Sequence, residues 1–197
     1  MREDQMTPEE RRILRRRKAP AIHRWEQEMS AQLDLAPERF RRGRWDRWRG
    51  IYQAICQRFA NRTQTWKNGL HWANTNGYSP WAMERLAGTW QAEPDSWFSA
   101  LPELLPQETG MVYFLLDLGG DPCGADSFWL FEGFLSQLLQ VLALLNQTAF
   151  LGLGWPDYYI VSQKYRWIIG YNHHDVVSLA GEGFSAGALA EFLGPPA

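Results

Sequence analysis

The stretch that decides the fold is Asp157–Asp175, which reads DYYIVSQKYRWIIGYNHHD. Two runs of β-branched and aromatic residues, Tyr158–Gln163 and Arg166–Tyr171, flank a turn at Lys164-Tyr165. Residues of these types favour strands, so the stretch predicts a β-hairpin. The hairpin runs directly into a polar group, Asn172-His173-His174-Asp175.

Further strands are expected on both sides of this hairpin. MVYFLLDL begins at Met111 and is closed by turn-forming residues at Gly119–Pro122, SFWLFE begins at Ser127, and DVVSLAG begins at Asp175. Between them, Phe134–Gln147 places leucines on one face of a predicted helix. The fold class predicted is therefore α+β, with an antiparallel sheet of about five strands and helices packed on one face.

Residues 1–107 are predicted to be mainly helical and residues 108–197 to carry the sheet, within a single domain. A first helix starts after the capping residue Thr7 and continues to Leu33, with a break at Ala19-Pro20. A second runs from about Pro37 to Asn61, although its glycines weaken it. Shorter helices are expected at Pro80–Trp90, Asp95–Leu105 and Ser185–Phe192.

The charge distribution is asymmetric although the net charge is only −2. Residues 1–67 hold 17 basic and 9 acidic residues, a net of +8, and residues 68–197 hold 3 basic and 13 acidic residues, a net of −10. Parts of opposite sign either dock on each other or meet different partners.

Several classes of protein are not favoured by this sequence. It has no apolar run long enough to cross a membrane and no apolar signal core, so we expect a cytoplasmic protein with no membrane partner. Cys56 and Cys123 stand alone, which is typical of reduced thiols rather than of a metal or redox site. No phosphate-binding or dinucleotide-binding loop is present, and we expect no cofactor.

The polar group at 172–175 is the natural place for a metal or an acid–base pair, because histidine titrates near neutral pH and binds metals readily. Its spacing argues against this. Neighbours in a strand point to opposite faces, so His173 and His174 share one ion only if a bulge or turn re-aims them. We interpret these residues as fixing the turn by hydrogen bonding or as recognising a ligand or partner. We predict no catalytic residue and no metal site.

The residues around this group carry a resemblance to a known family. Phe128–Gly133 reads FWLFEG, Tyr158–Ile168 reads YYIVSQKYRWI, and NHHD follows at Asn172–Asp175. The region from Met111 to Gly181 resembles uncharacterised bacterial proteins that share YYIVSKKYxWLxxxNHHD, preceded by FW-x-[FY]-E-G and a leucine-rich helix. Gln163 stands where that pattern has lysine.

In size and style these proteins resemble the small cytoplasmic immunity proteins that bind and block a cognate bacterial toxin. The resemblance implies a non-enzymatic protein-binding module whose partner is a toxin, and the acidic part of the chain favours a toxin with a basic surface. Exposed tryptophans and arginines would supply the main contacts. The candidate binding residues are Glu132, Trp167, Asn172, His173, His174 and Asp175.

Two alternatives stay open at this point. The first is a small enzyme that uses Asn172–Asp175, together with Glu132, at the edge of the sheet. The second is a nucleic-acid-binding protein that uses the N-terminal arginines, since RRILRRRK and RFRRGRWDRWR suit phosphate contact and base stacking. We do not favour nucleic acid as a partner, because glutamates are mixed into the basic part.

Overall fold

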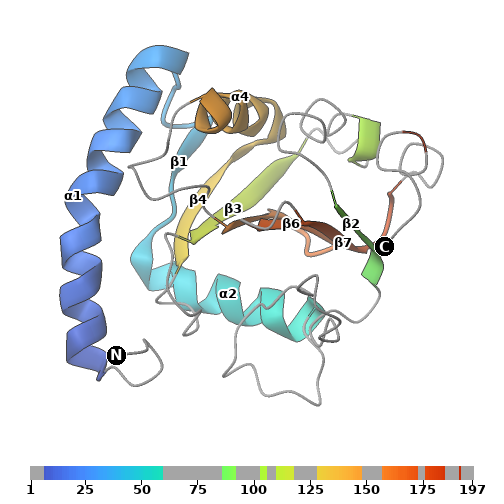
Figure 1. Cartoon of the computed structure of the whole chain (residues 1–197), viewed down its shortest axis with the longest axis horizontal. Coiled ribbons are helices and arrows are strands. Elements are labelled where there is room, and N and C mark those ends of the chain that lie inside the picture. Colours follow the sequence, from blue (N-terminus) through green and yellow to red (C-terminus); the bar gives the residue numbers. More distant parts are fainter. Residues whose placement is uncertain are drawn as a thin grey trace.

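The structure is a computed structural model and describes residues 7–59, 86–91, 103–105, 110–117, 128–147, 157–172, 176–184 and 191. Helices and strands alternate irregularly along the chain, as in an α+β fold (Figure 1). The elements are α1 (Pro8–Leu33), β1 (Phe40–Arg42), α2 (Trp45–Phe59), β2 (Leu86–Gln91), β3 (Met111–Asp117), β4 (Phe128–Phe134), α4 (Leu135–Gln147), β5 (Asp157–Ser162), β6 (Trp167–Asn172) and β7 (Val176–Gly181).

The strands form one sheet of seven strands in the order β1-β4-β3-β5-β6-β7-β2, and every neighbouring pair is antiparallel. The five strands predicted from the sequence are β3 to β7, and they occupy consecutive places in the sheet. The hairpin of β5 and β6 turns at Tyr165, whose N–H donates to the Ser162 carbonyl at 2.8 Å. The leucine-rich helix is also confirmed, as α4.

The two outer strands, β1 and β2, were not predicted. β1 lies inside the segment expected to be helical from Pro37 to Asn61, which is in fact divided into β1 and α2. Gly43 permits the division, because a Cβ at this position would lie 2.8 Å from Leu130 Cδ2, and its N–H donates to the Leu130 carbonyl at 2.8 Å. The described part of the expected helix at 80–90 is instead β2, where pairing with β7 outweighs local preference.

Two other expected helices lie largely outside the described residues. Of Asp95–Leu105 the structure describes only positions 103–105, and of Ser185–Phe192 only position 191. The predicted break at Ala19-Pro20 is wrong, since α1 runs unbroken through Pro20. Pro20 is exposed, so the carbonyl that loses its helical donor there can bond to water instead. At its start, α1 has the predicted cap at Thr7, which forms a capping box with Glu10.

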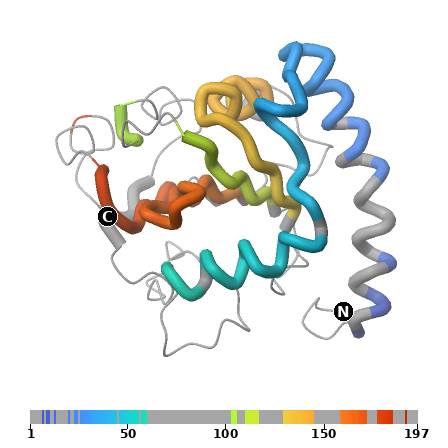
Figure 2. Tube along the Cα trace, turned by 180° about the vertical axis from the view of Figure 1, so that it is seen from behind, coloured from blue at the N-terminus to red at the C-terminus, as the bar shows by residue number. Residues whose placement is uncertain are grey.

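The sheet is covered on both faces, so the prediction that helices pack on one face only is wrong. All residues from Val112 to Leu116 of β3 are buried, although successive side chains of a strand point to opposite faces. Figure 1 shows α4 above the sheet and α2 below it, and Figure 2 shows the same layers from behind. The reason is the apolar sequence of the central strands, which needs cover on both sides.

We predict that Gly133→Ala lowers the free energy of unfolding by about 1 to 3 kcal/mol, measured by urea denaturation. A Cβ at Gly133 would lie 2.6 Å from the Arg39 carbonyl oxygen and 2.7 Å from Phe40 Cδ2, so β1 must move away from β4. Gly50→Ala is the control, because nothing lies within 4 Å of a Cβ at this helical position. It should raise stability by about 0.5 to 1 kcal/mol. Equal effects of the two variants would contradict the close packing of β1 on β4.

Candidate functional site

A buried glutamate lies in the middle of β4, between β1 and β3. Glu132 is 4% exposed, faces Arg41 of β1 in register on one side, and faces Tyr113 of β3 on the other. Residues directly opposite each other in antiparallel strands share a face of the sheet, so these three side chains form one row. The row places a basic, an acidic and a phenolic group side by side.

Two arginines compensate the buried charge. Nε and Nη2 of Arg41 both lie 2.8 Å from Glu132 Oε1, and Nη1 of Arg47, on α2, lies 4.0 Å from Oε2. The side chain of Glu132 is 5% exposed, whereas those of Arg41 and Arg47 are 54% and 52% exposed. A buried carboxylate is costly without a paired cation. The arginines therefore allow Glu132 to lie inside the sheet while they themselves remain in contact with water.

Two tyrosines extend this group along the same face. The ring of Tyr165 lies 5.9 Å from that of Tyr113, and Tyr165 has a positive φ of 53° at the turn between β5 and β6. Burial, together with the charge and hydrogen bonding of Tyr113, raises the pKa of Tyr165 to about 12, while the positive charge of Arg47 acts in the opposite direction. The name Glu132 site is used below for Arg41, Arg47, Tyr113, Glu132 and Tyr165.

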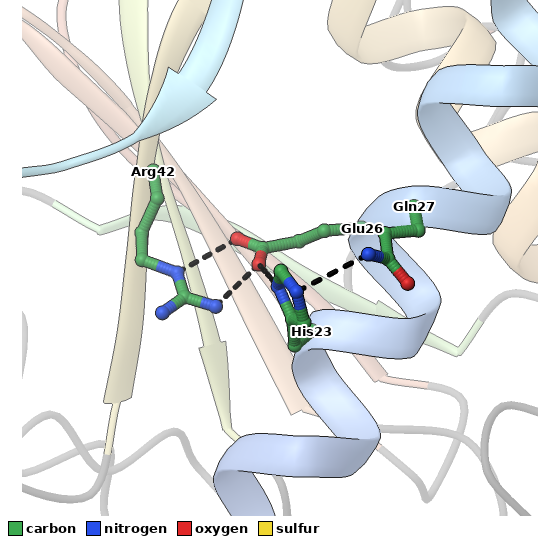
Figure 3. Close-up of polar contacts among 4 residues, drawn as sticks. All are labelled: His23, Glu26, Gln27 and Arg42. Carbon is green, nitrogen blue, oxygen red and sulfur yellow. Dashed lines mark hydrogen bonds and ion pairs between the residues drawn. The ribbon is translucent and has the colours of Figure 1, made fainter.

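A second polar network joins α1 to the edge strand β1 (Figure 3). Arg42 donates to both carboxylate oxygens of Glu26, with Nε at 2.7 Å from Oε1. His23 lies 3.7 Å from the same carboxylate and 3.2 Å from the amide of Gln27. The guanidinium of Arg42 also lies 4.9 Å from the ring centre of Trp129, a cation–π contact. Arg42 thus ties α1 to the sheet from the face opposite Glu132.

The contacts show that the basic and acidic parts of the chain dock on each other through three ion pairs at two places. Arg41 and Arg47 bind Glu132, and Arg58 at the end of α2 lies 3.4 Å from Glu182. Arg58 also donates to the Tyr165 carbonyl at 3.2 Å. This is one of the two arrangements that the charge asymmetry left open.

The three candidate binding residues that the structure describes, Glu132, Trp167 and Asn172, do not form one cluster. Trp167 is 1% exposed and lies against Phe184, so it is a core residue. Its neighbour Ile168, and not Trp167, shares the face and the register row of Glu132.

Asn172 ends β6, four residues beyond that row and three strands away from β4. It therefore lies about 13 Å along and about 14 Å across the sheet from Glu132. His173, His174 and Asp175 lie outside the described residues. Of the residues proposed for an enzyme site at 172–175, only Asn172 is described, and the strand geometry separates it from Glu132.

Sequence reasoning identified Glu132 but missed Arg41 and Arg47 as its partners. The signal was a single carboxylate in the otherwise apolar strand FWLFEGF, which must find a cation when buried. The arginine run near residue 40 contains these cations, but it was interpreted as a possible contact for a partner protein or for phosphate. Pairing of β1 with β4 brings the arginine run close to Glu132. This pairing was not predicted, because Pro37–Asn61 was expected to be one helix with no strand in it.

Other kinds of site were sought within the described part of the chain. It contains no group of three or more histidine, cysteine, aspartate or glutamate residues placed to hold a metal ion. Among the helices described, none combines the length and apolar character needed to cross a membrane.

Comparison with known proteins gives one match. Residues 22–186 match the family described as "Family of unknown function (DUF6756)". No curated protein and no solved structure matches the chain. Because the match covers most of the sequence, from the middle of α1 through β7, the chain belongs to this family.

We predict that Glu132→Gln lowers the free energy of unfolding by about 1 to 3 kcal/mol, because it removes the charge that accepts hydrogen bonds from Arg41 and forms an ion pair with Arg47. Glu182→Gln is the matched control: its side chain is 64% exposed, and the loss of such a surface pair should cost less than about 1 kcal/mol. Urea denaturation of both variants measures the difference. If Glu132→Gln is as stable as the control, the buried pair does not stabilise the fold.

The raised pKa of Tyr165 predicts a stability change at high pH. The phenol is neutral in the folded state up to about pH 12, whereas in the unfolded chain it ionises near its ordinary pKa of 10.0. Its contribution is therefore complete below pH 10 and is lost as the pH rises towards 12. NMR of ring-labelled tyrosines should show one signal with this pKa, absent in Tyr165→Phe. Arg47→Gln should raise that pKa further, and a fall would contradict the contact.

Proposed function

We propose that this chain is a non-enzymatic protein-binding module, and more specifically an immunity protein that binds and neutralises a cognate toxin. The observation that carries the proposal is a set of exposed but charge-compensated arginines on β1 and around the start of α2, of which Arg41 and Arg47 belong to the Glu132 site and Arg42 lies on the opposite face of the sheet. Its members are Arg41, Arg42, Arg44 and Arg47, and each has a carboxylate within 4.0 Å. The name arginine surface is used for these four residues.

Such a surface suits a protein partner. Arginine is enriched at the energetic centres of protein interfaces, and it contributes most when its geometry is fixed before binding. The carboxylates of Glu26, Asp46 and Glu132 fix the guanidinium groups here. Trp48 and Trp129 are buried, so these two side chains are not available as contacts, whereas the arginines are exposed.

Compensation of charge also argues for protein rather than nucleic acid at this surface. Nucleic-acid affinity comes largely from a series of cations that neutralise successive phosphates. Here Arg42 and Arg44 are already paired with Glu26 and Asp46, and Arg41 and Arg47 share Glu132. The surface therefore presents many hydrogen-bond donors with little excess charge, as interfaces between proteins do.

The charge expected of the toxin depends on which surface it meets. The acidic part of the chain favours a basic toxin, but two of its described glutamates, Glu132 and Glu182, are occupied by arginines of the same chain. A contact on the arginine surface would instead use acidic groups of the toxin. The basic surface of the toxin and the cytoplasmic location of the complex stay predictions.

Affinity capture with the tagged full-length chain from its source cell, read by mass spectrometry, tests this function. We expect one protein partner in stoichiometric amount. Expressed alone in a bacterial host, that partner should arrest growth, and co-expression of the chain should restore growth because the complex blocks the toxin. An unrelated tagged protein of similar charge controls for adsorption. Capture of nucleic acid instead, or of a partner that is harmless when expressed alone, would overturn the immunity assignment.

A further inference from the structure

We infer that Arg41 and Arg47 together form a receptor for a single carboxylate group, supplied by an aspartate or glutamate side chain of the partner protein. This inference rests on the proposed function and gives it a point of contact. It starts from the charges of the Glu132 site, where two guanidinium groups share one carboxylate. One positive charge therefore remains uncompensated within the group.

Exposure decides which charge an incoming anion meets. The side chain of Glu132 is 5% exposed, while Arg41 and Arg47 are 54% and 52% exposed. An anion that approaches from water therefore contacts guanidinium groups and is shielded from the like charge of Glu132. The arrangement attracts a second carboxylate even though one carboxylate is already present.

The hydrogen-bond donors of the two arginines point to the same conclusion. A guanidinium has five N–H donors in a planar fork. Arg41 uses Nε and Nη2 on Glu132 Oε1, and further donors remain on its guanidinium. Arg47 lies 4.0 Å from Glu132 Oε2, which is an ion pair but longer than a hydrogen bond. Both arginines thus retain donors suited to the paired oxygens of a carboxylate.

The two arginines come from rigid elements, which lowers the cost of binding. Arg41 is held in register opposite Glu132 between β1 and β4, and Arg47 lies in the first turn of α2. Because their positions are fixed by the fold, little conformational entropy is lost when an anion binds. One excess charge at one place matches one acidic side chain, whereas a nucleic-acid backbone requires several in a row.

The first test uses the full-length chain and a labelled, capped hexaglutamate peptide as the probe, measured by fluorescence anisotropy at low salt. We expect Arg41→Gln/Arg47→Gln to weaken binding by about tenfold or more, since two charge-assisted contacts are lost. Arg47→Gln alone leaves the Arg41–Glu132 contact intact and should weaken binding by about threefold to tenfold. The single variant preserves a test if the double variant does not fold, which circular dichroism shows.

Arg49→Gln is the matched control, because it removes an exposed arginine of the same helix two residues further on, which a helix directs to a different side. It should change the affinity for the peptide by less than about twofold. If Arg49→Gln and Arg47→Gln weaken peptide binding equally, the binding comes from general electrostatic attraction. That result would contradict a carboxylate receptor formed by Arg41 and Arg47. Tighter binding of a single-stranded oligonucleotide of the same charge, lost with Arg41 and Arg47, would overturn it in favour of phosphate.

The second test separates this inference from the proposed function, using the captured partner. If the double variant loses the partner and Arg49→Gln keeps it, both are supported. If all variants capture the partner equally, the receptor is wrong and the immunity function stands. If the wild-type chain captures no partner but binds the peptide through Arg41 and Arg47, the carboxylate receptor stands and the immunity function falls.

Discussion

A carboxylate placed inside an apolar sheet must be paired with a cation, and much of this structure follows from that requirement at Glu132. The neighbouring strand that supplies the cation is β1, so Arg41 has to stand opposite Glu132 in register. A shift by one residue would send Arg41 to the other face and leave the carboxylate unpaired. Two other features serve the same pairing. β1 approaches β4 closely at Gly133, and α2 is placed so that Arg47 lies near Glu132.

The strands that could be predicted are those whose residues specify a strand without help. β3 to β7 are rich in β-branched and aromatic residues, and all five were predicted. β1 could not be predicted in this way, because Phe40-Arg41-Arg42 has no strand pattern and pairs only after β4 has formed. The unbroken apolar runs of the central strands did contain the information that both faces are covered, since a sheet with one wet face alternates.

The candidate site could be predicted only in part, for a related reason. Glu132 was a candidate as an acidic residue near the end of a predicted strand. Its partner Arg41 lies 91 residues away in sequence, and no local pattern links the two. The histidines next to Asn172 attracted attention through their chemistry alone. The sheet places Asn172 in a different part of the molecule from Glu132. These two residues were both chosen for their chemistry, but they are not neighbours in the structure. Trp167 was chosen from a motif, and its role in the fold is packing.

The long sequence separation between Arg41 and Glu132 also sets the order in which the chain can assemble as it leaves the ribosome. The strands that pair with near neighbours in sequence, β3 with β4, β5 with β6 and β6 with β7, can form as soon as they emerge. β1 is synthesised early, but it cannot pair until β4 has been synthesised. Arg58 lies 124 residues before its partner Glu182, so this contact forms later still. Arg41 and Arg47 are thus held in position only after β4 has been synthesised, and Arg58 only after Glu182. A truncated product that stops before β4 would carry the arginines without the receptor.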